Sequence, residues 1–202
     1  AANRLLIAAV SPEARTAGLA AGMTLAKARA LVPGLDVRDA DPEGDSAFLA
    51  RLATLAARRW TPRAAPDAPD GLRLDLTGVA HLFGGEEAMA RRILAVCTRL
   101  GFTARIAVAP SYGAAHALAR FGGEPLLLNR DPAAILPLPL ASLRLDERSL
   151  ATARRLGLET VADLAALPRA PLQRRFGEAA LVRLDQALGR AAEPFDPLVP
   201  EA

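Results

Sequence analysis

The stretch that most constrains the fold is residues 69–78, with the sequence PDGLRLDLTG. Leucines occupy every second position from 72 to 76, and charged residues stand between them. This alternation predicts a β-strand with one face buried in a core. Asp70 stands at the entrance of the predicted strand, where a carboxylate is well placed to reach a metal ion. One carboxylate does not make a catalytic site, so any chemistry here needs groups from elsewhere in the chain.

The residues downstream of this strand predict an α+β fold. The expected elements are a helix over 86–100, a strand over 103–109, a helix over 110–121 and a strand over 126–128. The order strand, helix, strand, helix, strand favours one small sheet with helices on one face. Upstream, residues 61–69 are rich in Pro, Ala and Asp, which predicts a crossing loop that leads into the first strand.

The N-terminal residues predict an apolar strand followed by helices. Residues 5–10, LLIAAV, predict a buried strand. Ser11 and Thr24 are typical N-caps, Thr24 for a helix over 25–31, and a longer helix is expected to open at residues 39–42 and to run through 59. The apolar face of this longer helix is predicted to consist of Phe48, Leu52 and Leu55.

The C-terminal third is predicted to be helical with short turns. Residues 136–140, LPLPL, mark a break. The helices expected after it cover residues 146–156, 160–166, 169–175 and 177–188. Small helical pairs of this kind form helix-hairpin-helix modules, which hold a nucleic-acid backbone by main-chain amides and a helix end.

Composition removes several classes of protein. Cys97 is the only cysteine, and His81 and His116 are the only histidines, which excludes an internal disulfide and argues against structural zinc. Lys and Arg outnumber Asp and Glu by only 25 to 22, so a nucleic-acid surface has to be a local patch. No apolar run is long enough for a membrane span and nothing resembles a signal peptide, so we expect a cytoplasmic protein without a membrane partner.

The ordered set of motifs resembles the Y-family (UmuC/DinB-like) of translesion DNA polymerases. Residues 11–15, SPEAR, with residues 18–23, GLAAGM, resemble the fingers motif Tyr-Glu-Ala-Arg followed by Gly-Val-x-x-Gly-Met. The opening stretch resembles the palm motif Ser-Ile-Asp-Glu-Ala-Tyr-Leu-Asp, with Asp70 and Asp75 at its two aspartates. Residues 105–109 resemble the family's second palm segment, and residues 141–190 resemble its thumb.

The resemblance implies an α+β palm with a small sheet, helical fingers and an all-α thumb like a helix-hairpin-helix. The implied boundaries are 1–10 for a partial palm strand, 11–65 for the fingers, 66–138 for the palm and 139–202 for the thumb. The family's first palm strand would precede residue 1 and its little finger would follow residue 202. We therefore expect the chain to be a fragment of a longer protein.

Departures from the family pattern fall on positions that carry its chemistry. Gly71 stands where the family has a catalytic glutamate, so Asp70 and Gly71 are relic positions and no intact catalytic or metal site is expected. Pro12 replaces the fingers tyrosine that packs on the incoming nucleotide, which leaves Arg15 as a candidate triphosphate contact. His116 replaces a palm lysine aimed at the triphosphate and is a weaker, mostly neutral cation.

The implied DNA contacts lie in the thumb. Residues 144–146, Arg-Leu-Asp, replace the Gly-x-Gly hairpin with which the family approaches a DNA phosphate. Arg144 is a candidate side-chain contact there, although the aspartate repels phosphate. The other candidate DNA contacts are paired arginines, Arg154, Arg155, Arg174 and Arg175. The alternative for these pairs is an ordinary solvated helix face.

These losses together resemble the ImuB-type branch of the family, whose members are taken to be polymerase-inactive. Residues 74–85, LDLTGVAHLFGG, are close to that branch. The resemblance implies an accessory DNA-binding and scaffold role in damage-induced (SOS) translesion synthesis and mutagenesis, without a cofactor. The implied partners are damaged or primer-template DNA, the sliding clamp, an ImuA-type protein and an error-prone replicative-type polymerase. The proteins would bind through regions mostly outside this chain.

Two alternatives remain open. One is an active, error-prone translesion polymerase with a divergent site that uses Mg²⁺. The other is a generic helix-hairpin-helix DNA-binding protein that depends on residues 141–190 alone. For single residues, the structural alternatives are a strand-entry cap or turn residue for Asp70, an exposed or salt-bridged strand residue for Asp75 and a structural position on a helix for His116.

Overall fold

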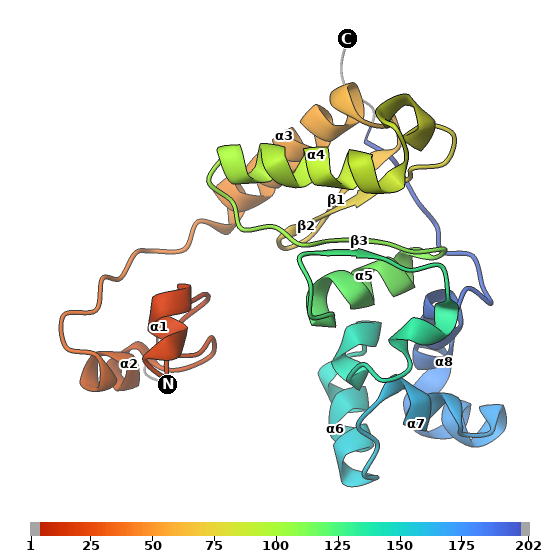
Figure 1. The fold of residues 1–202 in the computed structure, drawn as a ribbon. Helices are drawn as coiled ribbons and strands as arrows, with labels where there is room; N and C mark the ends of the chain where they lie inside the picture. Colours follow the sequence, from red (N-terminus) through yellow and green to blue (C-terminus); the bar gives the residue numbers. More distant parts are fainter. Residues whose placement is uncertain (1–4, 199–202) are drawn as a thin grey trace. The chain divides into compact units, whose positions relative to one another are not determined.

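The computed structural model describes residues 5–198, and the chain divides into two compact units, Ala1–Phe48 and Leu49–Ala202 (Figure 1). The first unit holds two short helices, α1 (Pro12–Thr16) and α2 (Leu25–Leu31). The hydroxyls of Ser11 and Thr24 each accept a hydrogen bond from an amide of the helix that follows, so both predicted N-caps are confirmed.

The predicted buried strand over residues 5–10 is wrong in its described part. Leu6 forms only an isolated antiparallel bridge with Thr24, and Leu5 and Leu6 are 66% and 59% exposed. The backbone of this segment bonds to residues 22–25, and this local turn-back satisfies groups that a sheet partner would otherwise pair. Residues 1–4 of the expected palm strand lie outside the described residues.

Helix α3 (Pro42–Arg59) confirms the predicted span but not the predicted apolar face. Its buried residues are Leu49, Ala53 and Ala56, whereas Phe48 and Leu55 are 37% and 36% exposed. The core of the second unit admits the alanine side of the helix, where a small side chain allows close backbone approach. Periodicity alone cannot separate that side from the neighbouring face of larger apolar residues.

An antiparallel hairpin of β1 (Ala64–Asp67) and β2 (Gly71–Leu74) contains the stretch with alternating leucines. The predicted alternation is confirmed, because the side chains at 72, 74 and 76 pack against a core built from α3 and α4 (Glu86–Arg99). The buried members of that core are Ala56, Trp60, Ala64, Met89, Ile93 and Val96. The predicted loop over 61–69 is wrong, since β1 lies within it and hydrogen-bonds to β2.

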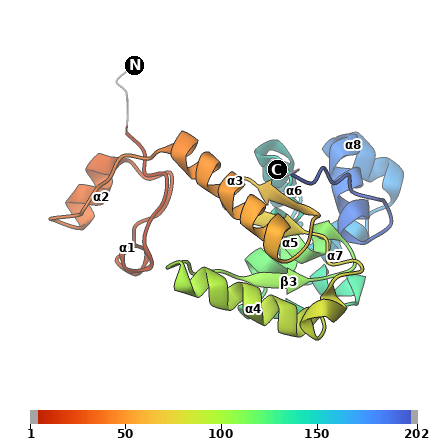
Figure 2. The same cartoon turned by 90° about the horizontal axis from the view of Figure 1, so that it is seen from above.

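Strands β3 (Ile106–Val108) and β4 (Leu126–Leu128) form a separate parallel pair joined by helix α5 (Tyr112–Phe121). The single sheet expected from the sequence is therefore two two-stranded sheets within residues 5–198. Helices also lie on both faces of β3 rather than on one, with α4 on one side and α5 on the other (Figures 1 and 2). A parallel pair needs such cover because neither of its faces is suited to water.

The C-terminal residues form the expected run of short helices around a second core. After two 3₁₀ turns, η2 (Pro132–Ile135) and η3 (Leu140–Leu143), come α6 (Glu147–Arg155), α7 (Val161–Ala165) and α8 (Arg169–Ala187). Gly177 interrupts α8 with φ 82° and ψ 170°, at the boundary predicted between two helices. These helices and α5 share one buried cluster. The α+β class is thus confirmed.

Helix α5 lies very close to α8 at Gly113. A Cβ atom placed on Gly113 would be 2.8 Å from the Cα of Ala187. The hydroxyl of Ser111 donates a hydrogen bond of 3.0 Å to the carbonyl of Ala187 at the same point. The contact between the two helices therefore depends on a residue without a side chain at position 113.

We expect Gly113→Ala to lower the free energy of unfolding by about 1–3 kcal/mol, because the added methyl group overpacks the backbone of α8. Gly123→Ala is the matched control, since a Cβ on Gly123 meets nothing within 4 Å. Urea unfolding followed by circular dichroism measures both variants. Equal unfolding midpoints for the two variants would contradict the proposed contact.

Candidate functional site

The turn of the β1–β2 hairpin, residues 67–71, is called the hairpin mouth, and it contains Asp70. Asp67 and Gly71 are paired at the end of the ladder, and Asp70 lies in the connection between them. The Asp70 side chain is 65% exposed and contacts the guanidinium group of Arg120, with Nη2 2.5 Å from Oδ1 and Nη1 3.4 Å from Oδ2. Asp70 is therefore a turn residue that forms an ion pair with α5.

One face of α5 supplies the groups that meet the hairpin. Tyr112, His116 and Arg120 are spaced four residues apart, so they lie along one side of the helix. The Nδ1 atom of His116 lies 3.3 Å from Oδ2 of Asp67, and the Tyr112 and His116 rings meet edge to face at 6.0 Å. Of these three residues only His116 was predicted as a site residue, although the i, i+4, i+8 spacing is visible in the sequence.

The Asp67 carboxylate and the groups around it are partly shielded from water. The Asp67 and His116 side chains are 25% and 11% exposed. Burial alone would raise the pKa of Asp67, but hydrogen bonding to His116 and the charges of His116 and Arg144 outweigh burial and hold the pKa low. Burial raises the pKa of the Tyr112 hydroxyl, and the nearby Asp67 carboxylate raises it further.

Position 71 is closely surrounded. A Cβ atom on Gly71 would lie 3.1 Å from the carbonyl oxygen of Asp67, 3.2 Å from Oδ2 of the same residue and 3.4 Å from Nη2 of Arg120. A longer acidic side chain here would have to pass between a carboxylate and a guanidinium group. The glycine therefore fits the ion pair that closes the hairpin mouth.

The residues that the structure describes do not bring together the carboxylates that a pair of Mg²⁺ ions needs. A two-metal site needs several carboxylate oxygens that face one point. Over residues 5–198, no three His, Cys, Asp or Glu side chains are grouped closely enough to hold a metal ion. Asp67 and Asp70 instead each face a basic side chain of α5, and Asp75 forms an ion pair of 2.8 Å with Arg63.

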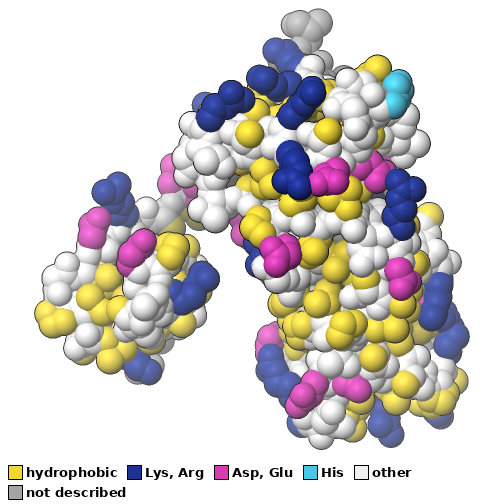
Figure 3. Space-filling view, in the orientation of Figure 1, with side chains coloured by type: hydrophobic (Ala, Val, Ile, Leu, Met, Phe, Trp, Pro, Cys, Tyr) yellow, Lys and Arg dark blue, Asp and Glu magenta, His cyan; other side chains and the backbone are white. Residues whose placement is uncertain are grey.

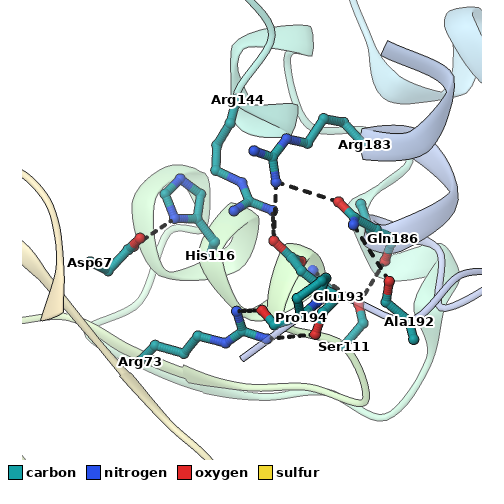
Figure 4. Close-up of polar contacts among 12 residues, drawn as sticks. Asp67, Arg73, Ser111, His116, Arg144, Arg183, Gln186, Ala192, Glu193 and Pro194 are labelled. Carbon is teal, nitrogen blue, oxygen red and sulfur yellow. Dashed lines mark hydrogen bonds and ion pairs between the residues drawn. The ribbon is translucent and has the colours of Figure 1, made fainter. Parts of the chain in front are cut away.

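A second polar cluster was not predicted. The segment after α8 passes a pocket of about 750 Å³ that lies beside Asp67 and Tyr112 and is also lined by α8. Glu193 on this segment accepts contacts from Arg144 at 2.8 Å and from Arg183 at 3.1 Å (Figure 4). The sequence has no local pattern that predicts this role of Glu193, because Arg144 is distant from it in the sequence and Arg183 lies on another element.

The predicted DNA and phosphate contacts fall in different surroundings. Arg144 has a left-handed backbone (φ 57°) and a side chain only 20% exposed. Arg154 is exposed and paired with Glu147 at 2.9 Å, and Arg155 donates to the Thr152 hydroxyl. Arg174 and Arg175 are exposed on α8, and their side chains have no partner among the described residues. Arg15 lies exposed on α1 of the first unit.

Residues 1–120 match the sequence profile of the impB/mucB/samB family. Protein ImuB from Caulobacter vibrioides is 48% identical over 178 residues, which cover 87% of this chain and 39% of that protein. DNA polymerase IV from Moorella thermoacetica is 30% identical over 202 residues, which cover 95% of this chain and 50% of that protein. The chain thus spans half or less of the length of these relatives.

Solved structures share the fold. A Y-family DNA polymerase chimera of Dbh and Dpo4 has a TM-score of 0.76 at 22% identity, covering 97% of this chain and 59% of that one. DinB from Sulfolobus solfataricus has a TM-score of 0.72 at 21% identity, covering 97% of this chain and 62% of that one. These likenesses confirm the polymerase-like fold.

None of the described helices is both long and apolar enough to cross a bilayer.

We expect the contacts of the Asp67 carboxylate to make stability depend on acid pH. The pKa of Asp67 is lower in the folded chain than its ordinary value of 3.8. Its stabilisation is therefore complete above that ordinary pKa and is lost as the pH falls through the lowered, folded-state pKa. Asp67→Asn should cost about 1–3 kcal/mol at pH 7 and should flatten the decline in stability below about pH 4.

Urea unfolding at pH 7 and at several pH values below 4 checks this expectation. Asp70→Asn is the control, because its exposed ion pair contributes about 0.2–1 kcal/mol. An unchanged pH profile in Asp67→Asn, or an equal loss at pH 7 in both variants, would contradict the structural role given to Asp67.

Proposed function

The chain belongs to the impB/mucB/samB family of Y-family DNA polymerases and their relatives, and we propose that it is a non-catalytic member of this family. It would bind DNA as an accessory factor in translesion synthesis after DNA damage. One observation carries the proposal: Asp70 is paired with Arg120, and the next position is Gly71. A positive side chain thus lies against the carboxylate that the sequence aligns with a metal ligand of the family, and polymerase chemistry needs several carboxylates around metal ions.

The charge at the hairpin mouth supports this proposal physically. The Arg120 guanidinium contacts Asp70 through both terminal nitrogens. A divalent ion at the same carboxylate would be repelled by that guanidinium at short range. The imidazole of His116 lies 3.3 Å from the neighbouring carboxylate, Asp67. Both acidic groups of the hairpin mouth therefore have partners from within the chain.

The thumb-like helices support a role in DNA binding. Arg174 and Arg175 are exposed on α8, and α6 ends with Arg154 and Arg155. Basic side chains also lie over α4, so charge alone does not single out the helices after residue 146, called the helical module (Figure 3). The 48% identity to ImuB further supports the accessory role. Under this proposal, a sliding clamp, an ImuA-type protein and an error-prone polymerase would be bound by regions mostly outside these residues.

An active polymerase is the second candidate, favoured by the 30% identity to a DNA polymerase IV. A primer-extension assay on the full-length protein with Mg²⁺ or Mn²⁺ distinguishes the two. We expect no template-dependent addition of nucleotides, because position 71 offers no carboxylate and Asp70 is paired. A DNA polymerase IV serves as the positive control.

Template-dependent addition that disappears in Asp70→Ala and persists in Glu124→Ala would overturn the non-catalytic proposal. Glu124 is a suitable control because it is an exposed acidic residue whose side chain has no partner among the described residues. The comparison separates loss of a metal ligand from loss of an arbitrary negative charge.

We expect the double variant Arg174→Ala/Arg175→Ala to weaken binding of primer-template DNA. Removing two phosphate contacts should reduce the slope of log K against log salt by about 1.8. Fluorescence anisotropy over a salt series measures this slope. The control is Arg91→Ala/Arg92→Ala, which removes the same charge from α4. Equal losses in both double variants would count against a DNA surface on α8.

A further inference from the structure

The segment after α8, residues 191–198, runs back along the β1–β2 hairpin and is called the strap here. The amide of Leu198 donates a hydrogen bond of 2.8 Å to the carbonyl of Ala64 on β1. Arg73 on β2 donates to the carbonyls of Pro194 at 2.7 Å and Glu193 at 3.1 Å. The same guanidinium lies 4.5 Å from the centre of the Phe195 ring. The strap is therefore tied to the hairpin by its backbone and by one ring.

Glu193 is the only charged side chain of the strap that is almost fully buried among the described residues, at 8% exposure. Its Oε1 atom receives both Arg144, from the turn before α6, and Arg183, from α8. Figure 4 shows the two guanidinium groups converging on this carboxylate from the helical side. One carboxylate is thus shared by two arginines that line the pocket.

The match between the carboxylate and the arginines is incomplete. The Oε2 atom of Glu193 and the Nε atom of Arg144 are both buried and have no hydrogen-bond partner among the described residues. Both residues line the same pocket. An arginine presents its Nε–H and one terminal N–H as a fork that suits a two-oxygen anion. In this arrangement the fork of Arg144 is only half used.

We propose that Arg144 and Arg183 form a binding site for a backbone phosphate of DNA, and that Glu193 blocks this site in the free chain. A phosphodiester carries one negative charge, as Glu193 does, and presents two oxygens that can engage the unused Nε–H of Arg144. Binding would replace Glu193 at the arginines and lift the strap from the hairpin. The inference rests on the proposed DNA-binding function and adds to it a site and a built-in inhibitory contact.

The arrangement explains why Arg144, a candidate DNA contact from the sequence, is turned inward. Its guanidinium lies 4.8 Å from the centre of the Tyr112 ring and is held there by Glu193. Removal of the negative charge at 193 would leave two like charges facing each other. Such a pair favours an anion from solution, and DNA supplies anions at high local density.

Glu193→Gln tests the proposal because it keeps the shape of the side chain and removes its charge. Anisotropy titration of a labelled primer-template duplex with the full chain should show about 5- to 10-fold tighter binding at about 0.1 M salt. The slope of log K against log salt should steepen by about 0.9 for each added phosphate contact. The double variant Glu193→Gln/Arg183→Gln should lose most of this gain.

Glu178→Gln is the matched control, because Glu178 lines the same pocket, is exposed and has no ion-pair partner among the described residues. Its effect should stay below about twofold, since an exposed charge acts only through screened, long-range repulsion. Equal gains in Glu178→Gln and Glu193→Gln, or a gain that survives in the double variant, would overturn the proposal.

Hydrogen exchange on the unmodified chain keeps the proposal testable if Glu193→Gln does not fold. Saturating duplex should speed exchange of the Leu198 amide by roughly fivefold or more, because the bond to Ala64 opens when the strap lifts. The Val161 amide, which donates to the carbonyl of Leu138 at 2.9 Å, is the internal reference and should not change. Unchanged protection of Leu198 at saturation would overturn the proposal.

The outcomes separate this inference from the function on which it rests. If the unmodified chain binds the duplex and Glu193→Gln gives no gain, the inhibitory contact fails and the DNA-binding function stands. If neither the unmodified chain nor Glu193→Gln binds, both fail. If only Glu193→Gln binds, the phosphate site is supported in its strongest form.

Discussion

The packing of α5 against α8 and the other C-terminal helices is the interaction on which the second unit depends, and one side of the same helix also meets the β1–β2 hairpin. His116 and Arg120 meet the two acidic residues of the hairpin mouth. On the same helix, Gly113 lies against α8 and Ala117 is buried in the core of the C-terminal helices. A single short helix thus connects the hairpin with the helical module, and both contacts need close approach.

The packing of the hairpin does not depend on the acidic groups at its turn. The leucines of the hairpin strand pack on α3 and α4 whether or not a metal ion is held at the strand entrance. At that entrance, the charge of Asp70 is balanced by Arg120, and Gly71 leaves room for this pair. The packing and the acidic groups are therefore physically separable, which is why fold does not fix function.

The strap, residues 191–198, links the hairpin to the C-terminal helices through polar contacts. Its backbone bonds to β1 and β2, while Glu193 binds arginines from the helical module. It therefore joins the same two parts that α5 joins, but through polar contacts rather than through packing. Packed side chains hold one arrangement, whereas an ion pair at a pocket can exchange one anion for another.

The sequence by itself determined the elements that have a local signal. Alternating leucines gave the hairpin strand, Ser11 and Thr24 gave helix starts, and Gly177 gave the break in α8. The family motifs added the overall class of fold. These features depend on neighbours in the chain, so a pattern of residue types is sufficient to predict them.

Only the tertiary structure decided which charges meet. The four residues of β1, AAPD, have no alternation, and they become a strand because β2 pairs with them. Asp70 and Arg120 are 50 residues apart, and Arg144 and Glu193 are 49 apart, so no local pattern links either pair. Such pairs form because separate helices and strands pack into one core, and that packing places the side chains within hydrogen-bonding distance.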